Sequence, residues 1–414
     1  MERRYKKELT STLYVVLLLA LIPHITVTIE IFLFLLSFFI FRYLLEERVY
    51  SQIFVIMAIF SLLTLFFGLP EYLILLSLII FLIIHWSRGV MEKSSIPADM
   101  AAISLSILIS VPLIGLYGLQ RMEFVFLLSV IGTIVGILFS TLSPPKDYGW
   151  TIPMTSCFAM WLFHSFGESS YFSPLPEYVL FVLVLMMVIG YLSNKAGLMD
   201  ITGVHSSILI GLLVMIFSGW KWFLVLLSFF ILGGLFTRYK YDYKASLGIA
   251  EKRGGARDYS NTFGNGLSST VCAIGYGICN FSGNPIFLIA FLGCVATAAG
   301  DTMASEIGET YKGRNVLITN FKRVPPGTNG GITILGELSA LLGVFIIYLT
   351  SFLLNLPVRE FSILFGVILG GFIGVNFDSL LGATLEGKYL NNSLVNLLST
   401  SFGGLISVLL YFHL

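Results

Sequence analysis

The sequence predicts an all-α, polytopic transmembrane helix bundle, and both its composition and its apolar runs indicate this fold class. Of the 414 residues, 57% are hydrophobic and 11% are charged, and the mean hydropathy is +0.91. Soluble domains carry about 25% charged residues, so the composition excludes a water-soluble enzyme, a disordered chain and a coiled coil. A membrane-spanning helix needs about 20 mostly apolar residues, and such runs recur along the chain.

About fifteen apolar runs have a length that suits a membrane span. They cover residues 11–29, 31–45, 51–68, 72–87, 100–119, 124–142, 151–167, 177–192, 203–219, 221–236, 262–281, 285–305, 332–353, 361–377 and 391–412. With the N-terminus in the cytoplasm, alternating loops place all of the 24 Lys and Arg residues except Arg121, Lys221 and Arg359 on the cytoplasmic side. Because Lys and Arg favour cytoplasmic loops, we expect a cytoplasmic N-terminus and a multi-pass protein of the cell membrane.

The chain divides into two parts of different character. Residues 1–146 hold six predicted spans with short connections and few polar residues, and we interpret them as an accessory helical region of unknown role. Residues 147–414 contain two long polar loops, at 237–261 and 307–331, and the neighbouring spans carry Asp, Glu, Asn and Gly clusters. We therefore expect the chemistry in residues 147–414.

The strongest candidate for a site begins at Asp301, where an apolar span ends. A charged residue at the centre of a bilayer costs about 2.5–3.5 kcal/mol, so Asp301 should face a wet cavity or a cation. The simpler alternative is that Asp301 lies at a helix end, from which its carboxylate reaches the membrane surface. Glu306 lies about 140° around a helix from Asp301, so both could bind one Mg²⁺ only if the helix breaks or another element completes the site. Of the two, Asp301 is the stronger candidate for a Mg²⁺ ligand.

Basic residues and a glycine-rich turn follow these carboxylates. Lys322 and Arg323 precede the sequence PPGTNGG, residues 325–331. Glycine permits a positive φ, and the exposed amides of such a turn can form a concavity that binds anions. If Ile332 begins the next helix, the N-terminal amides of that helix add to the same field. Beside intramembrane carboxylates, this pattern predicts a site for phosphate and a divalent metal.

Two further polar clusters fall on the same side of the membrane in this topology. The loop at 237–261 includes Arg253 and Arg257, and Asn265 lies just inside the following span. Such a loop can simply fix orientation or touch anionic lipid, although guanidinium groups also bind phosphate oxygens in a bidentate manner. Asp378, at the end of the fourteenth predicted span, is either a plain helix-end acid or part of the site. We predict that all these clusters form one site, open to cytosol and lipid.

Other site classes find no support in the residue spacing. The four cysteines form no CxxC pair, and the five histidines have no HxxxH or HExxH spacing, which argues against a disulfide framework and a zinc site. Nothing in the sequence indicates nucleic-acid binding.

Residues 180–414 resemble the membrane family that includes plant phytyl-phosphate kinase and transmembrane protein 19. The matching stretches are KRGGARDYSNTFGNG, GDTMASEIG, VPPGTNGGIT and FDSLLGATLE, in the family's order. An acidic helix followed by a basic, glycine-containing loop is more distantly similar to CTP-dependent phytol and dolichol kinases. The resemblance implies phosphoryl transfer from a nucleotide triphosphate, CTP being favoured, to an isoprenoid monophosphate such as phytyl or geranylgeranyl phosphate.

The same resemblance implies roles for individual residues. Asp301 and Glu306 would hold Mg²⁺ and would form the catalytic set with Lys322 and Asp378. The nucleotide would be held by Arg323, Gly327, Thr328, Asn329, Gly330 and Gly331. The acceptor phosphate would be held by Arg253, Arg257 and Asn265.

A secondary transporter of a small or lipid-linked anionic solute is the alternative function. Glycine-interrupted helices with acids near the midplane are typical of transporters, which need access from both sides of the membrane. The clusters in this sequence fall on one side, which favours a kinase. A lipid-binding or scaffolding protein without turnover would account for the basic loop alone.

Overall fold

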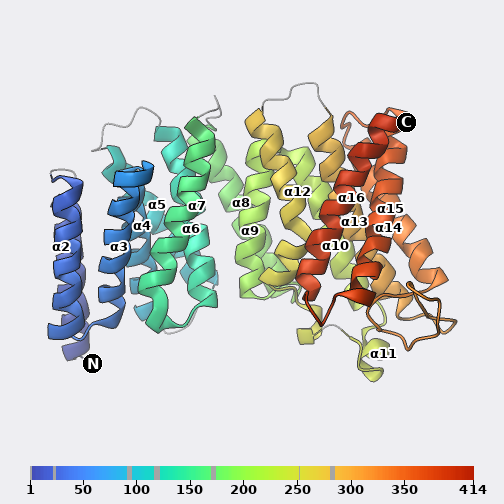
Figure 1. Ribbon diagram of the computed structural model, residues 1–414, viewed down its shortest axis with the longest axis horizontal. Helices are drawn as coiled ribbons and strands as arrows, with labels where there is room; N and C mark the ends of the chain where they lie inside the picture. The colour runs from blue at the N-terminus through green and yellow to red at the C-terminus, as the bar shows by residue number, and fades with distance from the viewer. Residues whose placement is uncertain are drawn as a thin grey trace. The chain divides into compact units, whose positions relative to one another are not determined.

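The computed structural model describes residues 2–21, 25–90, 96–115, 122–168, 174–250, 252–279 and 285–414. In these ranges the chain is built of helices, apart from one two-stranded sheet and the connecting turns. It divides into two compact units, Met1–Phe181 (unit 1) and Val182–Leu414 (unit 2). Within each unit the long helices run roughly side by side (Figure 1). The predicted all-α polytopic bundle is confirmed.

Unit 1 is a bundle of long helices. They are α1 (Glu2–Leu21), α2 (Val27–Phe39, continued by a π-helical turn at Ile40–Leu44), α3 (Arg48–Phe67), α4 (Glu71–Val90), α5 (Ile96–Gly115), α6 (Met122–Leu142), α7 (Tyr148–Glu168) and the first turns of α8 (Pro176–Lys195). Two buried acids of this unit have partners. Arg88 forms a 3.0 Å ion pair with Asp99, and the Ser61 hydroxyl donates to Glu30 at 3.1 Å. These bonds offset part of the cost of burying polar groups.

The division between the units comes later in the chain than the boundary predicted at residue 146. Helix α7 packs against α3, α4 and α6, so it belongs to unit 1 although its sequence is richer in polar residues. The first unit therefore extends to Phe181.

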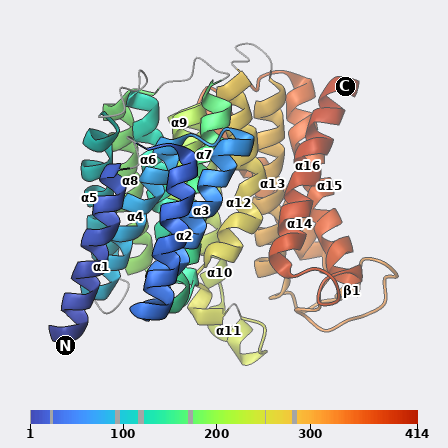
Figure 2. The ribbon, with the colours of Figure 1, turned by 60° about the vertical axis from the view of Figure 1, so that its left-hand side comes forward.

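Unit 2 has α13 at its centre, in contact with α10, α12, α14, α15 and α16. Its elements after α8 are α9 (Ile201–Ser218), α10 (Trp220–Arg238), α11 (Tyr241–Ser246), α12 (Tyr259–Cys279), α13 (Ile286–Gly308), β1 (Val316–Leu317), β2 (Gly331–Ile332), α14 (Ile334–Leu353), α15 (Phe361–Thr384) and α16 (Asn392–His413). Strands β1 and β2 pair in antiparallel fashion. Helix α11 and the β1 region lie at the same end of unit 2 (Figure 2).

Each predicted span overlaps one long helix, except 11–29, which begins on α1 and ends on α2. Among the described residues, eleven helices are long and apolar enough to cross a membrane. The total of about fifteen spans and the cytoplasmic N-terminus stay predictions.

Small residues allow the helices of unit 2 to cross closely. A Cβ atom on Gly374 of α15 would lie 2.4 Å from Oγ1 of Thr297 on α13. A Cβ atom on Gly343 of α14 would lie 2.9 Å from the carbonyl oxygen of Ala299. Close backbone approach of this kind is what associates helices in lipid. It fixes α13, α14 and α15 against one another, and therefore also fixes the polar residues at their ends.

The polar loops contain more regular structure than the sequence predicted. The loop expected at 237–261 includes helix α11, and α12 already begins at Tyr259. The expectation that Ile332 begins a helix is wrong, because Ile332 belongs to β2 and α14 begins at Ile334. The reason is local: Thr333 takes an extended backbone conformation, and its side chain caps α14 by accepting a 2.9 Å bond from the amide of Gly336.

The close crossing of α13 and α15 predicts the effect of enlarging Gly374. Gly374→Ala should lower the free energy of unfolding by about 1–3 kcal/mol, the usual cost of overpacking, because the new methyl group would meet Thr297. Thermal unfolding in detergent measures this. The neighbouring Ile373→Leu change, at a side chain that is 41% exposed, is the control and should leave stability unchanged. Equal stability of both variants would contradict the role of this crossing.

Candidate functional site

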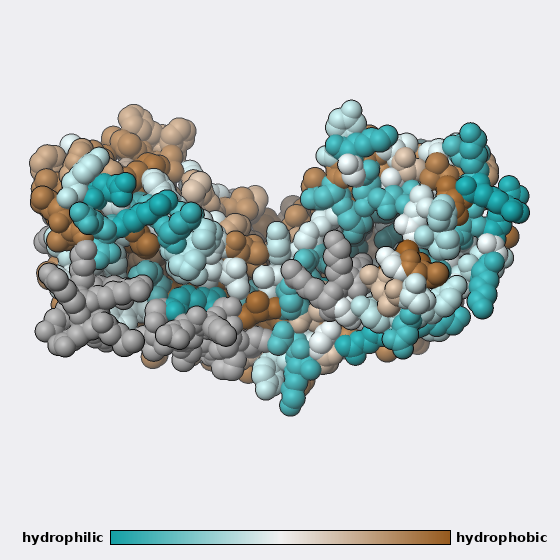
Figure 3. All heavy atoms as spheres, turned by 90° about the horizontal axis from the view of Figure 1, so that it is seen from below, coloured by the Kyte–Doolittle hydropathy of each residue, from teal (hydrophilic) through white to brown (hydrophobic). Residues whose placement is uncertain are grey.

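A polar cavity of about 370 Å³ lies in unit 2, at the end that carries α11 and the strands. Its walls come from the loop after α11, from α12 to α16 and from the turn before β2. The same end of unit 2 is mostly hydrophilic in the space-filling view (Figure 3). Polar residues from distant stretches of the sequence therefore line one cavity.

Most of the residues predicted for the site line this cavity. They are Arg257, Asn265, Asp301, Glu306, Gly327, Thr328, Asn329, Gly330, Gly331 and Asp378. Lys322 and Arg323 are exposed and are not part of the cavity wall. The side chain of Arg253 lies outside the described residues.

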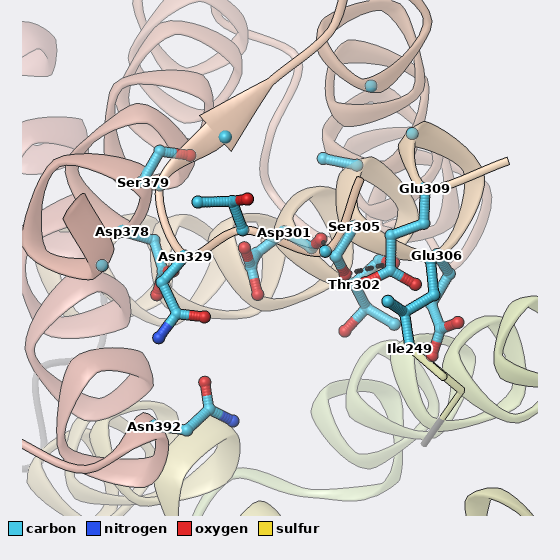
Figure 4. Close-up of a pocket in the computed structure, with 18 of the residues that line it drawn as sticks. Ile249, Asp301, Thr302, Ser305, Glu306, Glu309, Asn329, Asp378, Ser379 and Asn392 are labelled. Atoms are coloured by element: carbon cyan, nitrogen blue, oxygen red, sulfur yellow. Dashed lines mark hydrogen bonds between the residues drawn. The ribbon is translucent and has the colours of Figure 1, made fainter. Parts of the chain in front are cut away.

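Asp301 and Asp378 lie inside helices, one on α13 and one on α15. Each helix continues beyond its acid, α13 to Gly308 and α15 to Thr384. The close-up shows both side chains near Asn329 in the cavity (Figure 4). The hydroxyl of Ser399 donates to Oδ2 of Asp378 at 2.7 Å, which holds that carboxylate in place. The two rigid helices thus present two carboxylates to one space.

The cavity carries a surplus of negative charge. Its carboxylates are Asp301, Glu306, Glu309, Glu337, Asp378 and Glu386, whereas Arg257 is the one Lys or Arg side chain found in its described wall. Asp301 is repelled by Asp378, Glu386 and Glu306, and is attracted by Arg257. Burial raises the pKa of Glu386 above its usual value. Carboxyl groups gathered in this way supply the oxygen ligands that hard divalent cations prefer.

The donor set suits Mg²⁺ bound together with a substrate. Among the described residues, no group of three or more His, Cys, Asp or Glu side chains is arranged to hold a metal ion alone. Mg²⁺ is usually held by one or two carboxylates, by waters and by substrate phosphates, and seldom by an all-protein cage. Asp301 and Asp378 supply two such carboxylates in the same cavity, so the residues present fit this mode of binding.

Glu306 is held by a buried lysine. Lys244 of α11 is 0% exposed, forms an ion pair with the Glu306 carboxylate and donates to the carbonyl of Thr237 at 3.0 Å. Figure 4 shows Glu306 beside Ile249, apart from Asp301, in agreement with the wide angle between the two positions on the helix. The ion pair anchors α11 and the following loop to α13, so it helps to build the cavity wall.

The glycine turn is shaped by its packing on α15. Gly327 and Gly330 take positive φ angles of 76° and 73°. A Cβ atom on Gly330 would lie 2.5 Å from the carbonyl oxygen of Ser379, so this position requires glycine. Gly331 is not among the glycines with a positive φ. Gly331 belongs to β2, and its amide closes the turn by donating to the carbonyl of Thr328 at 2.8 Å.

Arg257 is positioned by both its backbone and its side chain. Its amide donates to the carbonyl of Leu198 at 2.9 Å, and its carbonyl accepts from the amide of Asp200 at 3.0 Å. The guanidinium carbon lies 5.2 Å from the ring centre of Phe229, a cation–π geometry. A Cβ atom on Gly233 would lie 2.1 Å from the guanidinium, so the glycine of α10 makes room for it.

Several cavity residues were not predicted. Asn392 and Asn396 of α16 line the cavity, and Figure 4 shows Asn392 near Asn329. Glu309 and Glu386 also line the cavity and were not predicted for the site, and neither was Lys244, which holds Glu306. No local signal marked Lys244 for burial, because it lies in the short, polar helix Tyr241–Ser246 and is buried through its tertiary contacts.

Comparison with known proteins assigns the C-terminal half of the chain, which contains the cavity, to a family. The profile of a family described as integral membrane protein DUF92 matches residues 184–404. The chain belongs to the DUF92 family. An uncharacterized membrane protein of Methanocaldococcus jannaschii is 38% identical over 234 residues, which cover 56% of this chain and 94% of that protein. No solved structure matches the chain.

Two other relatives align with much of their length. An uncharacterized membrane protein of Synechocystis is 34% identical over 204 residues, covering 48% of this chain and 77% of that protein. Protein VTE6, chloroplastic, of Arabidopsis thaliana is 30% identical over 234 residues, covering 55% of this chain and 69% of that protein. The resemblance inferred from the four sequence motifs is confirmed. All four motifs lie within the DUF92 region, as does the cavity.

The buried ion pair predicts a large loss of stability when one partner is removed. Lys244→Met should cost about 3–5 kcal/mol, because it leaves the Glu306 carboxylate buried and unpaired. The Lys244→Met, Glu306→Gln double variant should regain much of that loss. Lys240→Met, at an exposed lysine of the same loop, is the matched control. Thermal unfolding of the four purified proteins would contradict the assignment if Lys244→Met behaved like Lys240→Met.

Proposed function

We propose that this DUF92 protein is a membrane phosphotransferase, a kinase that passes a phosphoryl group from a nucleoside triphosphate to an isoprenoid monophosphate. CTP is the favoured donor, and phytyl or geranylgeranyl phosphate is a suitable acceptor. The reaction would take place at the cytoplasmic face of the cell membrane. Membership of a membrane family and the motif resemblance to phytyl-phosphate kinases support the reaction class.

One structural observation carries this proposal: two helix-borne carboxylates share a polar cavity with a single guanidinium. Asp301 and Asp378 form an acidic wall, and Arg257 supplies the positive charge. Phosphoryl transfer requires just these elements, namely oxygen ligands for a divalent metal and a cation for the acceptor phosphate. An acidic cavity admits a polyphosphate only when metal ions accompany it, which matches a nucleotide that binds as its magnesium complex.

In the proposed reaction the residues mainly bind, orient and neutralise charge. Asp301 and Asp378 would hold Mg²⁺, which when bound neutralises charge on the transferring phosphoryl group. Arg257 would bind the acceptor phosphate in a bidentate manner, with Asn265 donating a further hydrogen bond. An oxygen of the acceptor phosphate attacks the γ-phosphorus, the bond between that phosphorus and the bridging oxygen breaks, and a nucleoside diphosphate leaves. Because the second pKa of a phosphate monoester is about 6, the acceptor needs no general base.

The other predicted residues take more limited roles in this proposal. Glu306 was predicted as a second metal ligand, and its bond to Lys244 favours a structural role in this state. Lys322 and Arg323 precede the turn and lie on the surface, where they can attract an anionic nucleotide to the cavity mouth. Thr328 and Asn329 of the turn line the cavity and would contact the nucleotide.

A transporter remains the rival function class. Transport predicts uptake of an anionic solute into vesicles without nucleotide, whereas the kinase predicts that label from the γ-position of CTP enters the lipid phase. Both assays can be run on the same reconstituted protein. Uptake without label transfer would favour the transporter.

The proposal predicts that Asp301→Asn and Asp378→Asn each lower phosphoryl transfer by at least about 100-fold, because each removes a carboxylate ligand of the Mg²⁺ that would neutralise negative charge in the transition state. The assay uses purified protein, CTP labelled at the γ-phosphate, Mg²⁺ and geranylgeranyl phosphate. Asp242→Asn, at an exposed acid of α11, is the control and should keep full activity. Unfolding temperature checks that the variants fold. Transfer that survives in Asp301→Asn would remove the metal assignment.

A further inference from the structure

A second, apolar pocket adjoins the polar cavity. Its volume is about 80 Å³, and it lies between α8, α9, α10 and α12. Its walls include Met186 of α8, Ile210 of α9, and Leu226 and Phe230 of α10. We call it the apolar groove. All of its walls belong to unit 2.

The apolar groove and the polar cavity share part of one wall. Arg257, Asn261 and Asn265 line both of them. Phe229, whose ring carries the Arg257 guanidinium, also lines the groove. The guanidinium of Arg257 and the two asparagine amides therefore lie where the polar cavity meets the apolar groove.

We infer that the apolar groove binds the hydrocarbon chain of a single-chain lipid phosphate, whose phosphate group lies at Arg257, Asn261 and Asn265. This inference rests on the proposed function and identifies the site of its acceptor. The charge at this position complements a phosphate group, because Arg257 is the one Lys or Arg residue of the described cavity wall. The apolar walls of the groove likewise suit a hydrocarbon chain. Burying the first methylene groups of the chain stabilises binding by about 0.8 kcal/mol per group.

The size and position of the groove define the occupant further. A volume of about 80 Å³ is small beside the 370 Å³ of the polar cavity, so the groove holds only the portion of one chain that follows the phosphate. The remainder of a long chain would extend into the surrounding lipid. We therefore expect one hydrocarbon chain at this junction, and not the two chains of a phospholipid.

Ser207 of α9 offers a way to fill the groove without touching the polar residues. It lines the groove, is half-buried, and its hydroxyl donates to the carbonyl of Val204 at 2.9 Å. Ser228 of α10 is also half-buried and bonded in the same way, to the carbonyl of Val225 at 2.7 Å. Ser228 lines neither the groove nor the cavity. Ser207→Leu and Ser228→Leu are therefore a matched pair.

The test compares a long acceptor with a short one. Ser207→Leu should lower kcat/KM for geranylgeranyl phosphate about tenfold, mainly through KM, because two or three methylene groups lose their burial. For dimethylallyl phosphate, a five-carbon acceptor with little chain beyond the phosphate, the loss should be about twofold or less. Ser228→Leu should change neither. Equal losses for both acceptors would overturn the inference.

A binding measurement separates failure of this inference from failure of the proposed function. A photoreactive, single-chain alkyl phosphate is cross-linked to the whole protein without nucleotide, and the labelled peptides are mapped. We expect label on α9 and α10, displaced by geranylgeranyl phosphate and reduced in Ser207→Leu but not in Ser228→Leu. Label elsewhere, or displacement by phosphatidic acid at lower concentration, overturns the inference. If α9 and α10 are labelled as expected but no nucleotide donates a phosphoryl group, the groove still binds a lipid phosphate and the proposed kinase activity is refuted.

Discussion

Close packing of glycine-bearing helices around α13 is the constraint on which the candidate site depends. Asp301 and Asp378 lie on separate helices inside an integral membrane fold, and carboxylates there repel one another and are costly to desolvate. They can be held together only if the backbones that carry them cannot move apart. The crossing of Gly374 against Thr297 fixes α15 on α13, and the bond from Ser399 orients Asp378. Small residues in the apolar half of the helices thus determine the geometry of the polar end.

The sequence predicted the fold class and several residues of the cavity wall because both follow from strong local signals. Long apolar runs specify helices, and acids or amides at their ends cannot face lipid, so Asp301, Asn265 and the 327–331 turn had to share a polar space. The details depended on tertiary contacts that carry no local signal. Lys244 was one base among several in a polar loop until its contact with Glu306 placed it in the interior. The role of Gly331 depended on pairing with β1, a contact between residues far apart in the loop.

The basic residues show how a correct pattern can still mislead about individual positions. A run of bases near a glycine turn predicted phosphate binding by Lys322 and Arg323, yet both are exposed. Of the described cations, Arg257 reaches the cavity because Gly233 leaves room for its guanidinium and Phe229 supports it. Lys244 is buried but neutralised by Glu306. The described wall is therefore acidic, the opposite of what the count of bases in the two loops suggested.

A carboxylate-rich cavity that includes the guanidinium of Arg257 is a selective arrangement for anions. A free phosphate or nucleotide is repelled by the carboxylates, whereas the same group with a divalent cation is attracted. A lipid phosphate that enters by way of the apolar groove reaches Arg257 first and meets the carboxylates only beyond it. The two substrates of the proposed reaction would thus approach the same point from spaces of opposite polarity.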